Sequence, residues 1–215
     1  MTKIEPQDWF QVHGDDTLAL DWPGVDENSI VWEIGGYKGR WASQMAEKYD
    51  PTLYIFEPQD WAHAEIVSKL GHNEKAHIYQ FGLWTHAGRM TLNEYGRDGG
   101  TLMQPDAKDP HPVMVTDVYS LFIHEHVDQI DVCLMNIEGG EFVLLPYMIG
   151  MGMIPHIKYF WCQWHLFVQS AAEKMIRIHK MLAQTHDLMW DCGSTAQAWV
   201  RKGTPEYRIW YDEDK

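Results

Sequence analysis

Two carboxylates and an amide occur together just after an apolar run in the middle of the chain. Asn136, Glu138 and Glu141 lie in IDVCLMNIEGGE, with Gly139 and Gly140 between the acids. Such groups are unfavourable in a core unless they are solvated, paired or placed against a ligand. We predict a functional site here, with Glu138 as a candidate general base and Asn136 as a group that orients a hydroxyl. One of the two glutamates can instead serve the N-terminus of a following helix.

A histidine follows the next apolar run. His165 closes IKYFWCQWH, after Gln163 and Trp164. Its imidazole is a candidate base for a hydroxyl proton, or a satisfied core histidine. His124 and His126 are two residues apart in SLFIHEHVD, a stretch typical of a helix, on which their side chains diverge. We therefore predict no metal site.

A glycine turn beside an acid follows the first apolar run. Glu33, Gly35 and Gly39 form E-x-G-x-x-x-G, with Gly36 and Tyr37 between the glycines. This spacing differs from the G-x-G-x-x-G of dinucleotide sites. The carboxylate would repel a pyrophosphate but suits a cationic ligand such as S-adenosylmethionine, which carries a sulfonium and an ammonium.

A second acid follows the second apolar run. Glu57, with Pro58 after it, lies 22 residues beyond Gly35. In adenosine-binding sheets an acid at this position accepts hydrogen bonds from ribose hydroxyls. Together with the glycine turn, this acid is compatible with S-adenosylmethionine as the cofactor; the alternative is that Gly35 and Gly36 form only a tight turn.

These residues need a sheet whose strand ends bring them together. Short apolar runs alternate with helical stretches: SIVWEI (29–34), LYIFEP (53–58), HIYQFGL (77–83), IDVCLM (130–135) and IKYFWC (157–162). Helices are expected over 39–49, 60–71 and 170–185, with Asp60 capping the second helix and Gly71 ending it. The pattern predicts a parallel α/β sheet that binds ligands at the carboxyl ends of its strands. The last runs, DLMW, AQAWV and YRIWY, predict antiparallel strands.

The remaining segments favour a single domain of 215 residues. Residues 1–28 form an N-terminal extension, and 96–112, rich in Gly and Pro, predict a long loop that is either a lid or a plain crossover. We expect these two segments to build the substrate pocket. Trp84 and Trp164, near strand ends, are candidates for stacking on adenine or substrate, and the other tryptophans are expected in the core.

Charge and cysteine content restrict the partners. There are 17 Lys and Arg against 31 Asp and Glu, a formal net charge of −14, which repels a polyphosphate backbone. The three cysteines show no C-x-x-C spacing, the start resembles no signal peptide, and the apolar run 142–154 is shorter than the ~20 residues of a membrane span. We expect a cytoplasmic protein with reduced thiols and a small-molecule or sugar partner, and neither nucleic acid nor membrane.

The runs IVWEIGGYKGRWA, LYIFEP and IDVCLMNIEGGE resemble the FkbM-type S-adenosylmethionine-dependent methyltransferases. The family pattern is roughly D-x-G-A-N-x-G, a strand ending F-E-P, and K-I-D-V-E-G-A-E, and the resemblance covers about residues 30–166 in the same order. It implies a class I Rossmann-like fold with a mostly parallel seven-stranded sheet, 3-2-1-4-5-7-6, and helices on both faces. It also implies roles for matching residues: Glu33, Gly35, Gly36, Tyr37 and Gly39 at the methionine end of the cofactor, Glu57 and Pro58 at the ribose, and Glu138, Gly139 and Glu141 at the substrate.

The sequence departs from that pattern at several positions. Glu33 and Asn136 stand where Asp is usual, Tyr37 where Asn is usual, Leu134 where Lys is usual, and Gln163 where an acid precedes the family's histidine. The resemblance implies an O-methyltransferase that acts on a hydroxyl of a small molecule or sugar. Two alternatives stay open: a nicotinamide-dependent oxidoreductase, and a non-catalytic carbohydrate-binding module on a degenerate methyltransferase scaffold.

Overall fold

A seven-stranded sheet forms the centre of the protein. The computed structural model describes residues 8–94, 100–102, 110–193 and 195–207. The strands are β1 (Ile30–Ile34), β2 (Thr52–Phe56), β3 (Ala76–Tyr79), β8 (Ile130–Met135), β9 (Ile157–Cys162), β10 (His186–Asp191) and β11 (Gln197–Arg201). Their order is β10-β11-β9-β8-β1-β2-β3, with β11 antiparallel to both neighbours and the other pairs parallel. Counted alone along the chain, these strands lie in the order 3-2-1-4-5-7-6, which confirms the expected topology.

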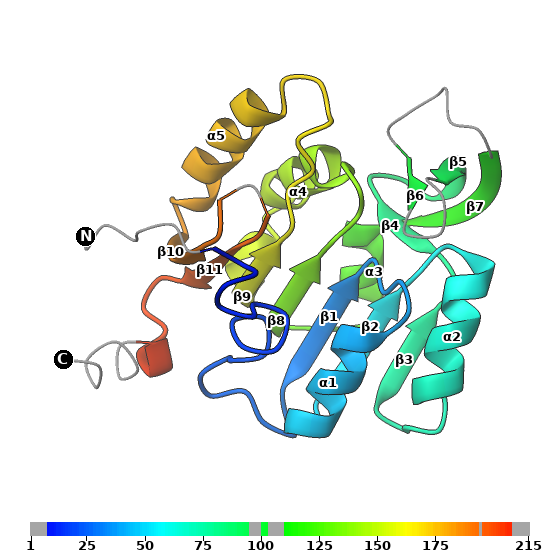
Figure 1. Cartoon of the computed structure of the whole chain (residues 1–215), viewed down its shortest axis with the longest axis horizontal. Coiled ribbons are helices and arrows are strands. Elements are labelled where there is room, and N and C mark those ends of the chain that lie inside the picture. The colour runs from blue at the N-terminus through cyan, green and yellow to red at the C-terminus, as the bar shows by residue number, and fades with distance from the viewer. Residues whose placement is uncertain (1–7, 95–99, 103–109, 194, 208–215) are drawn as a thin grey trace.

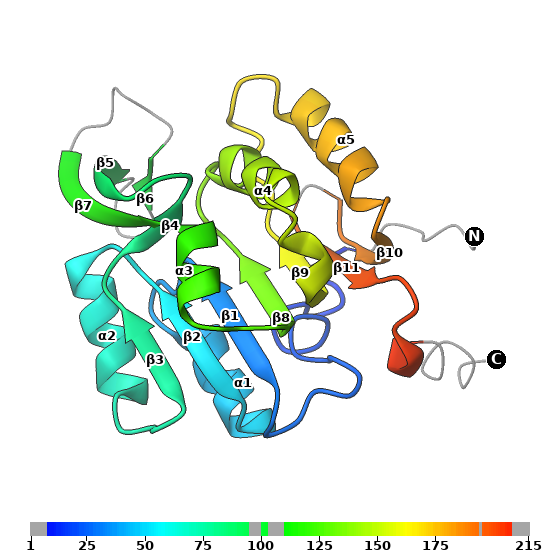
Figure 2. The same ribbon diagram turned by 180° about the vertical axis from the view of Figure 1, so that it is seen from behind.

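Helices cover both faces of the sheet, as expected (Figures 1 and 2). The helices are α1 (Arg40–Tyr49), α2 (Asp60–Leu70), α3 (Val118–His124), α4 (Glu141–Gly150) and α5 (Ala171–Leu182), with a 3₁₀ turn at Ile154–His156 before β9. One core packs α3, α4 and α5 on one face, and the other packs α1, α2 and the N-terminal segment on the opposite face. The apolar runs are buried because each strand contributes to both cores.

The parallel register brings the strand ends to one edge. Ile34 pairs with Phe56 and with Met135, and Met135 pairs with Cys162. The residues that follow β1, β2, β8 and β9 therefore emerge side by side. This alignment places the predicted site residues at the carboxyl edge of the sheet.

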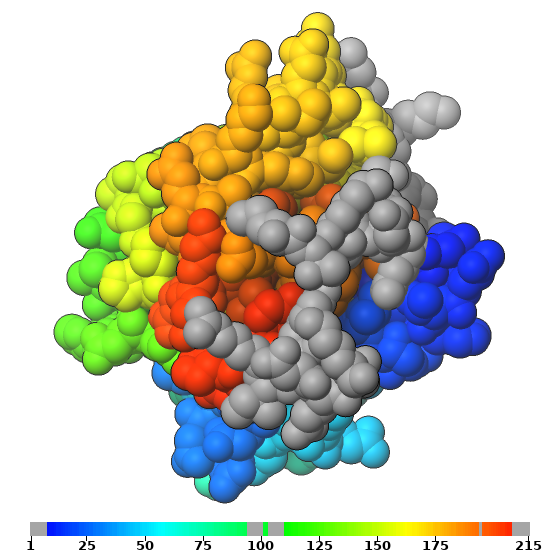
Figure 3. Space-filling model, turned by 90° about the vertical axis from the view of Figure 1, so that its left-hand side faces the viewer, coloured from blue at the N-terminus to red at the C-terminus, as the bar shows by residue number. Residues whose placement is uncertain are grey.

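The N-terminal segment covers the sheet with tryptophan rings. Trp9 stacks on Trp161 with ring centroids 5.7 Å apart and also contacts Trp190, while Trp22 contacts Trp190 and Tyr159. Figure 3 shows this segment in blue beside the orange and red C-terminal strands. The tryptophans of this group are buried, so the core prediction is confirmed for them.

A second, four-stranded sheet was not predicted. It contains β4 (Gly82–Trp84), β5 (Gly88–Glu94), β6 (Gly100–Thr101) and β7 (Pro110–Asp117) in the order β4-β7-β5-β6. The predicted single strand 77–83 is wrong, because the chain leaves the main sheet after β3 and enters the second sheet at β4. The long-loop prediction for 96–112 is wrong where β6 and the start of β7 pair with β5; residues 96–99 and 103–109 lie outside the described part.

Several local predictions also changed. Gln59, not Asp60, precedes the first turn of α2, and the Asp60 carboxylate instead accepts a hydrogen bond from Gln80. Helix α3 ends at His124, so His126 lies beyond it with a φ of 52°. Of YRIWY, only its first residue is described.

The three cysteines are free and buried, as expected. Within the described ranges, none of the helices combines the length and apolar character that a membrane crossing requires.

Candidate active site

The glycine turn after β1 is held closely against β8. Gly35 has a φ of 90°, and a Cβ there would lie 2.0 Å from the carbonyl oxygen of Asn136. Its amide and that of Gly36 donate to the carbonyl of Phe56, at 3.0 and 3.2 Å. Only glycine fits this approach, which explains the first glycine of the motif.

Glu57 is anchored by two backbone amides. Its Oε2 accepts from the amide of Tyr37 and its Oε1 from the amide of Gln59, each at 2.8 Å. Burial raises the pKa of Glu57, and although these hydrogen bonds lower it, the resulting value is about 7. The carboxyl group is therefore fixed in position and close to half-ionised at neutral pH.

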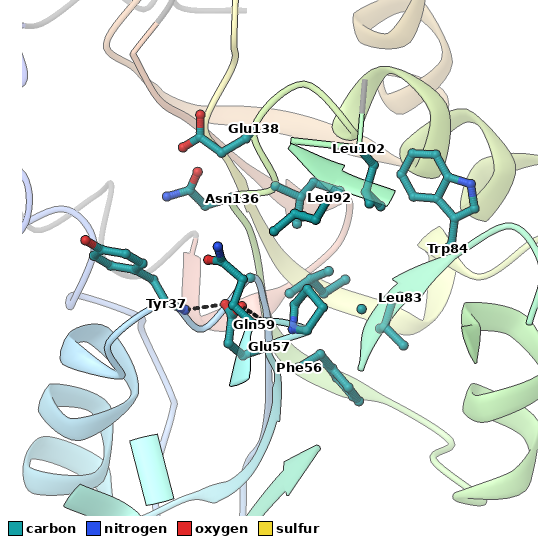
Figure 4. A pocket seen from close by; sticks show the side chains of 15 residues that line it. Tyr37, Phe56, Glu57, Gln59, Leu83, Trp84, Leu92, Leu102, Asn136 and Glu138 are labelled. Carbon is teal, nitrogen blue, oxygen red and sulfur yellow. Dashed lines mark hydrogen bonds between the residues drawn. The ribbon is translucent and has the colours of Figure 1, made fainter. Parts of the chain in front are cut away.

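One cavity, which we call the β4-side cavity, opens between Glu57 and the second sheet and has a volume of about 120 Å³. Figure 4 shows polar and apolar side chains lining it from different sides. The polar group is Tyr37, Glu57, Gln59, Asn136 and Glu138, and the apolar group is Phe56, Leu83, Trp84, Leu92 and Leu102. The cavity suits a planar apolar body with a polar end.

A second cavity, the α1-side cavity, lies across the glycine turn and has a volume of about 360 Å³. Gly35, Tyr37 and Asn136 line both cavities, so the two adjoin at the turn. The N-terminal segment supplies Trp9, Phe10 and Asp15 to this cavity, and the strand ends supply Leu134, Trp161 and Gln163. The N-terminal extension therefore lines a cavity, and its role in a substrate pocket stays a prediction.

Two buried acceptor atoms at the glycine turn have no hydrogen-bond partner among the described residues. They are Oε2 of Glu33 and Oδ1 of Asn136, and both residues line the α1-side cavity. Glu33 is 3% exposed. Desolvation and, secondarily, the charge of Glu57 raise the pKa of Glu33 well above its usual range. A buried acceptor without a donor is unfavourable, and a cationic ligand would satisfy it.

The acids after β8 form a cluster with His165. Oε2 of Glu138 lies 3.3 Å from Nε2 of His165, and Oε1 of Glu141 lies 3.2 Å from Nδ1. Glu141 is fully buried and also accepts from the amides of Gly139 and His165, at 2.9 and 2.8 Å. Glu141 is the first residue of α4, so of the two glutamates it is Glu141 that serves the N-terminus of a helix.

The two carboxylates determine the charge of His165. Burial lowers the pKa of His165, but hydrogen bonds and charge from Glu138 and Glu141 outweigh burial and raise it to about 9. At neutral pH the ring is therefore an imidazolium, which donates protons from both nitrogens and cannot accept one. Glu138 is the partly exposed member of the cluster and faces the β4-side cavity.

The structure gathers most predicted residues at the two cavities. Those that line at least one are Glu33, Gly35, Gly36, Tyr37, Glu57, Pro58, Asn136 and Glu138. Gly39 lines neither; it precedes α1 with a φ of 67° and packs against Ile66. His165 contacts the site through Glu138.

The two tryptophan candidates differ. Trp84 lines the β4-side cavity as predicted. Trp164 lines neither cavity: it is 3% exposed, donates to Gln197 at 2.8 Å and packs against Phe142. Its proposed stacking role is wrong because the ring turns into the core.

The sequence did not reveal the wall residues at the second sheet, above all Leu92 on β5 and Leu102, which directly follows β6. It also missed Gln59, which follows the F-E-P motif by one residue and could have been found there. The second sheet left no usable signal, because β6 is two residues long and β7 begins with the pattern PHP.

Comparisons with known proteins were made by sequence and by structure. No protein-family model and no curated protein matches the sequence. The structure is similar to an rRNA methylase from Streptococcus thermophilus, with a TM-score of 0.51 and 12% identity over 94% of this chain and 98% of that one. It is similar to a methyltransferase-like protein from Streptococcus mutans solved in complex with SAH, with a TM-score of 0.52 and 9% identity over 92% and 99% of the two chains. An rRNA-methylase-like protein from Clostridium thermocellum gives a TM-score of 0.54 and 9% identity over 92% and 98%.

These likenesses, together with the sheet order, define the fold class. The chain has the Rossmann-like α/β fold of class I methyltransferases. At such low identity the likeness describes the fold, and function has to be argued from the site.

Proposed function

We propose that this protein is an S-adenosylmethionine-dependent O-methyltransferase of the FkbM type, acting on a hydroxyl of a small molecule or sugar. The observation that carries the proposal is the buried Oε2 of Glu33 in the wall of the α1-side cavity, which has no hydrogen-bond partner among the described residues. A buried carboxyl group whose pKa is strongly raised, with no counter-charge among the causes of that shift in the described part of the chain, fits a ligand that brings a positive charge.

The residues present fit this cofactor in three parts. Glu33 and Asn136 would hold the cationic methionine end, Glu57 would accept from the ribose hydroxyls, and the apolar wall of the β4-side cavity would receive the adenine. When bound, S-adenosylmethionine would supply an electrophilic methyl group for an in-line displacement. The S. mutans protein, of the same fold, was solved with SAH, which supports this assignment.

Glu138 is the group we assign to proton removal from the acceptor hydroxyl. It lies at the end of β8, reaches the β4-side cavity and is held by His165 on one oxygen. Because His165 is protonated at neutral pH, its role is to orient Glu138 and stabilise its negative charge. The side chain of Asn136, between the two cavities, can orient the hydroxyl.

The α1-side cavity adjoins the β4-side cavity at Asn136, and its chemistry supports a neutral hydroxylated acceptor whose reacting hydroxyl reaches Glu138 past Asn136. Its walls combine the rings of Trp9, Phe10 and Trp161 with the polar groups of Gln163 and Thr195. Aromatic faces with neighbouring amides and hydroxyls suit sugars and other small polyols. Two of the structurally similar proteins are named for rRNA, but the charge of −14 disfavours a phosphate backbone here.

The cofactor assignment is tested by calorimetry. We expect wild-type protein to bind S-adenosylmethionine and Glu57→Ala to bind it about tenfold or more weakly, because a hydrogen bond to a charged group contributes about 1.5–3 kcal/mol. Glu173→Ala, which removes an exposed acid on α5, is the control and should bind normally. Absence of binding by the wild type would end the proposal.

Turnover tests the assignment of Glu138. Glu138→Gln should keep cofactor affinity but lose methyl transfer across a panel of hydroxylated acceptors. Unchanged transfer would remove Glu138 from the base role. Cofactor binding without any transfer by the wild type would favour the non-catalytic carbohydrate-binding alternative, and binding of NADH instead would favour the oxidoreductase.

A further inference from the structure

Glu138 has a backbone conformation that few side chains adopt. Its φ is 49°, and Gly139 follows with a φ of 97°. The left-handed region is unfavourable for a residue with a Cβ, so neighbouring contacts must hold it in place. In this conformation Oε2 of Glu138 lies 3.3 Å from Nε2 of His165.

One contact to this turn comes from the second sheet. The hydroxyl of Thr101 donates to the carbonyl oxygen of Glu138 at 2.5 Å, across 37 residues of sequence. Thr101 is fully buried and lies on β6, which pairs with β5 through Asn93. Its hydroxyl therefore joins the peptide of Glu138 to the second sheet, which also supplies the apolar wall of the β4-side cavity.

We propose that Thr101 is a positioning residue that holds the Glu138 turn, and with it the carboxylate, against His165. The inference rests on the proposed function, in which Glu138 is the base. The second sheet then both lines the β4-side cavity and sets the orientation of the Glu138 carboxylate, which accepts the proton.

The physical reason is the directionality of a buried hydrogen bond. A valine at this position keeps the shape of threonine but cannot donate, which leaves the carbonyl of Glu138 without this partner in a dry environment. The turn can then relax to a conformation without a positive φ. The Glu138 carboxylate moves away from His165, and the imidazolium keeps only its contact to Glu141.

The test reads His165 directly and needs no acceptor. Protein labelled with ¹⁵N-histidine is titrated by NMR without cofactor, and His165 is assigned by the loss of its signal in His165→Gln. We expect a wild-type midpoint of about 9. In Thr101→Val the midpoint should fall by about 1 pH unit or more, the size expected when a close opposite charge is lost. Glu138→Gln should lower it at least as far.

Two controls separate a positioning role from a structural one. Thr101→Ser retains the hydroxyl and should titrate like the wild type, and Thr91→Val, an exposed threonine on β5, should also be unchanged. A Thr101→Val midpoint equal to that of the wild type overturns the proposal, and so does a wild-type midpoint near 6.5. Calorimetry on the same samples tests the proposed function separately: S-adenosylmethionine affinity should be the same in Thr101→Val and wild type.

If Thr101→Val does not fold, two other measurements test the proposal. Thr101→Ala removes the hydroxyl without a branched side chain and should show the same fall in the midpoint. In the wild type, a hydrogen-bonded hydroxyl proton on Thr101 should exchange slowly with water and be visible by NMR. A rapidly exchanging hydroxyl contradicts the inference.

Discussion

Two pairs of acids lie at the carboxyl edge of the same sheet, in opposite electrostatic states. Burial raises the pKa of both Glu33 and Glu57, beside the glycine turn, and the charge of Glu57 raises that of Glu33 further; no cationic side chain is among the causes of these shifts. Glu138 and Glu141, after β8, enclose the protonated ring of His165. The first pair lacks a cation, whereas the second pair contains one.

The comparison shows which acids obtain a counter-charge from the fold and which need one from a ligand. We call Glu138 and Glu141 the β8 pair, and Glu33 and Glu57 the turn pair. The β8 pair already has its counter-charge, and the hydrogen bonds that Glu141 accepts stabilise the start of α4. In the turn pair, burial disfavours the ionised carboxylates. Because the pKa of Glu57 is raised to about 7, the free energy of unfolding should fall as the pH rises from about 4.5 to 7 and Glu57 ionises. Binding of a cation would reverse this penalty, so we expect the two pairs to respond oppositely to mutation.

The largest expected effect is on stability in the β8 pair. Glu141→Ala removes the acceptor of two amides and a charge partner of His165, and should lower the free energy of unfolding by about 3–5 kcal/mol. Glu138→Ala, at the partly exposed position, should lower it by only about 1 kcal/mol. Urea unfolding of both variants measures the difference, and equal losses would contradict the assignment of Glu141 as the anchor.

Removing charge from the turn pair should have the opposite sign. Glu33→Gln should raise the free energy of unfolding of the ligand-free protein by about 0.5–2 kcal/mol, because an uncompensated buried carboxyl group is lost. The same variant should bind S-adenosylmethionine at least about tenfold more weakly. Glu173→Gln is the control for both measurements, and a destabilised Glu33→Gln protein would show that Glu33 is structurally paired.

The pH dependence of stability should reveal His165. Its folded pKa of about 9 lies above the ordinary 6.5, so its contribution is fully present below pH 6.5 and is lost as the pH rises through 9. Because solvent screens the partly exposed Glu138, the free energy of unfolding should fall by only about 1–2 kcal/mol. Unfolding measured from pH 6 to 10 should show this fall in the wild type and not in His165→Gln; parallel profiles would contradict it.

The smallest expected effect is proton release on cofactor binding. Burial raises the pKa of Glu57 to about 7 and the pKa of Glu33 well above its ordinary value, and a cationic ligand favours the ionised forms of both. Affinity for S-adenosylmethionine should therefore increase by up to about tenfold from pH 6 to 7. Calorimetry at pH 6 in buffers of different ionisation enthalpy counts the released protons, and Glu57→Gln should release fewer. A count of zero would indicate that both acids are already ionised.

Much of the architecture could be predicted from local pattern. The buried strands were visible as apolar runs, and each is followed directly by a polar residue or a glycine: Gly35, Glu57, Asn136 and Gln163. A parallel sheet necessarily brings such strand ends to one edge. The second sheet could not be predicted, because β6 is too short for any periodicity and is held by pairing with β5. Trp164 was misplaced for a related reason: the sequence fixes its distance from the strand end but not the direction of its ring.

The sequence by itself determined the topology and the identity of the acids at the strand ends, because burial periodicity and glycine spacing are local properties of the chain. Only the tertiary structure decided which of those acids have a partner. Among the described residues, Oε2 of Glu33 is left without one, and Glu141 receives two amides and an imidazolium from segments up to 24 residues away. Compensation of charge depends on distances of about 3 Å between residues remote in sequence, and that information exists only once the chain has folded.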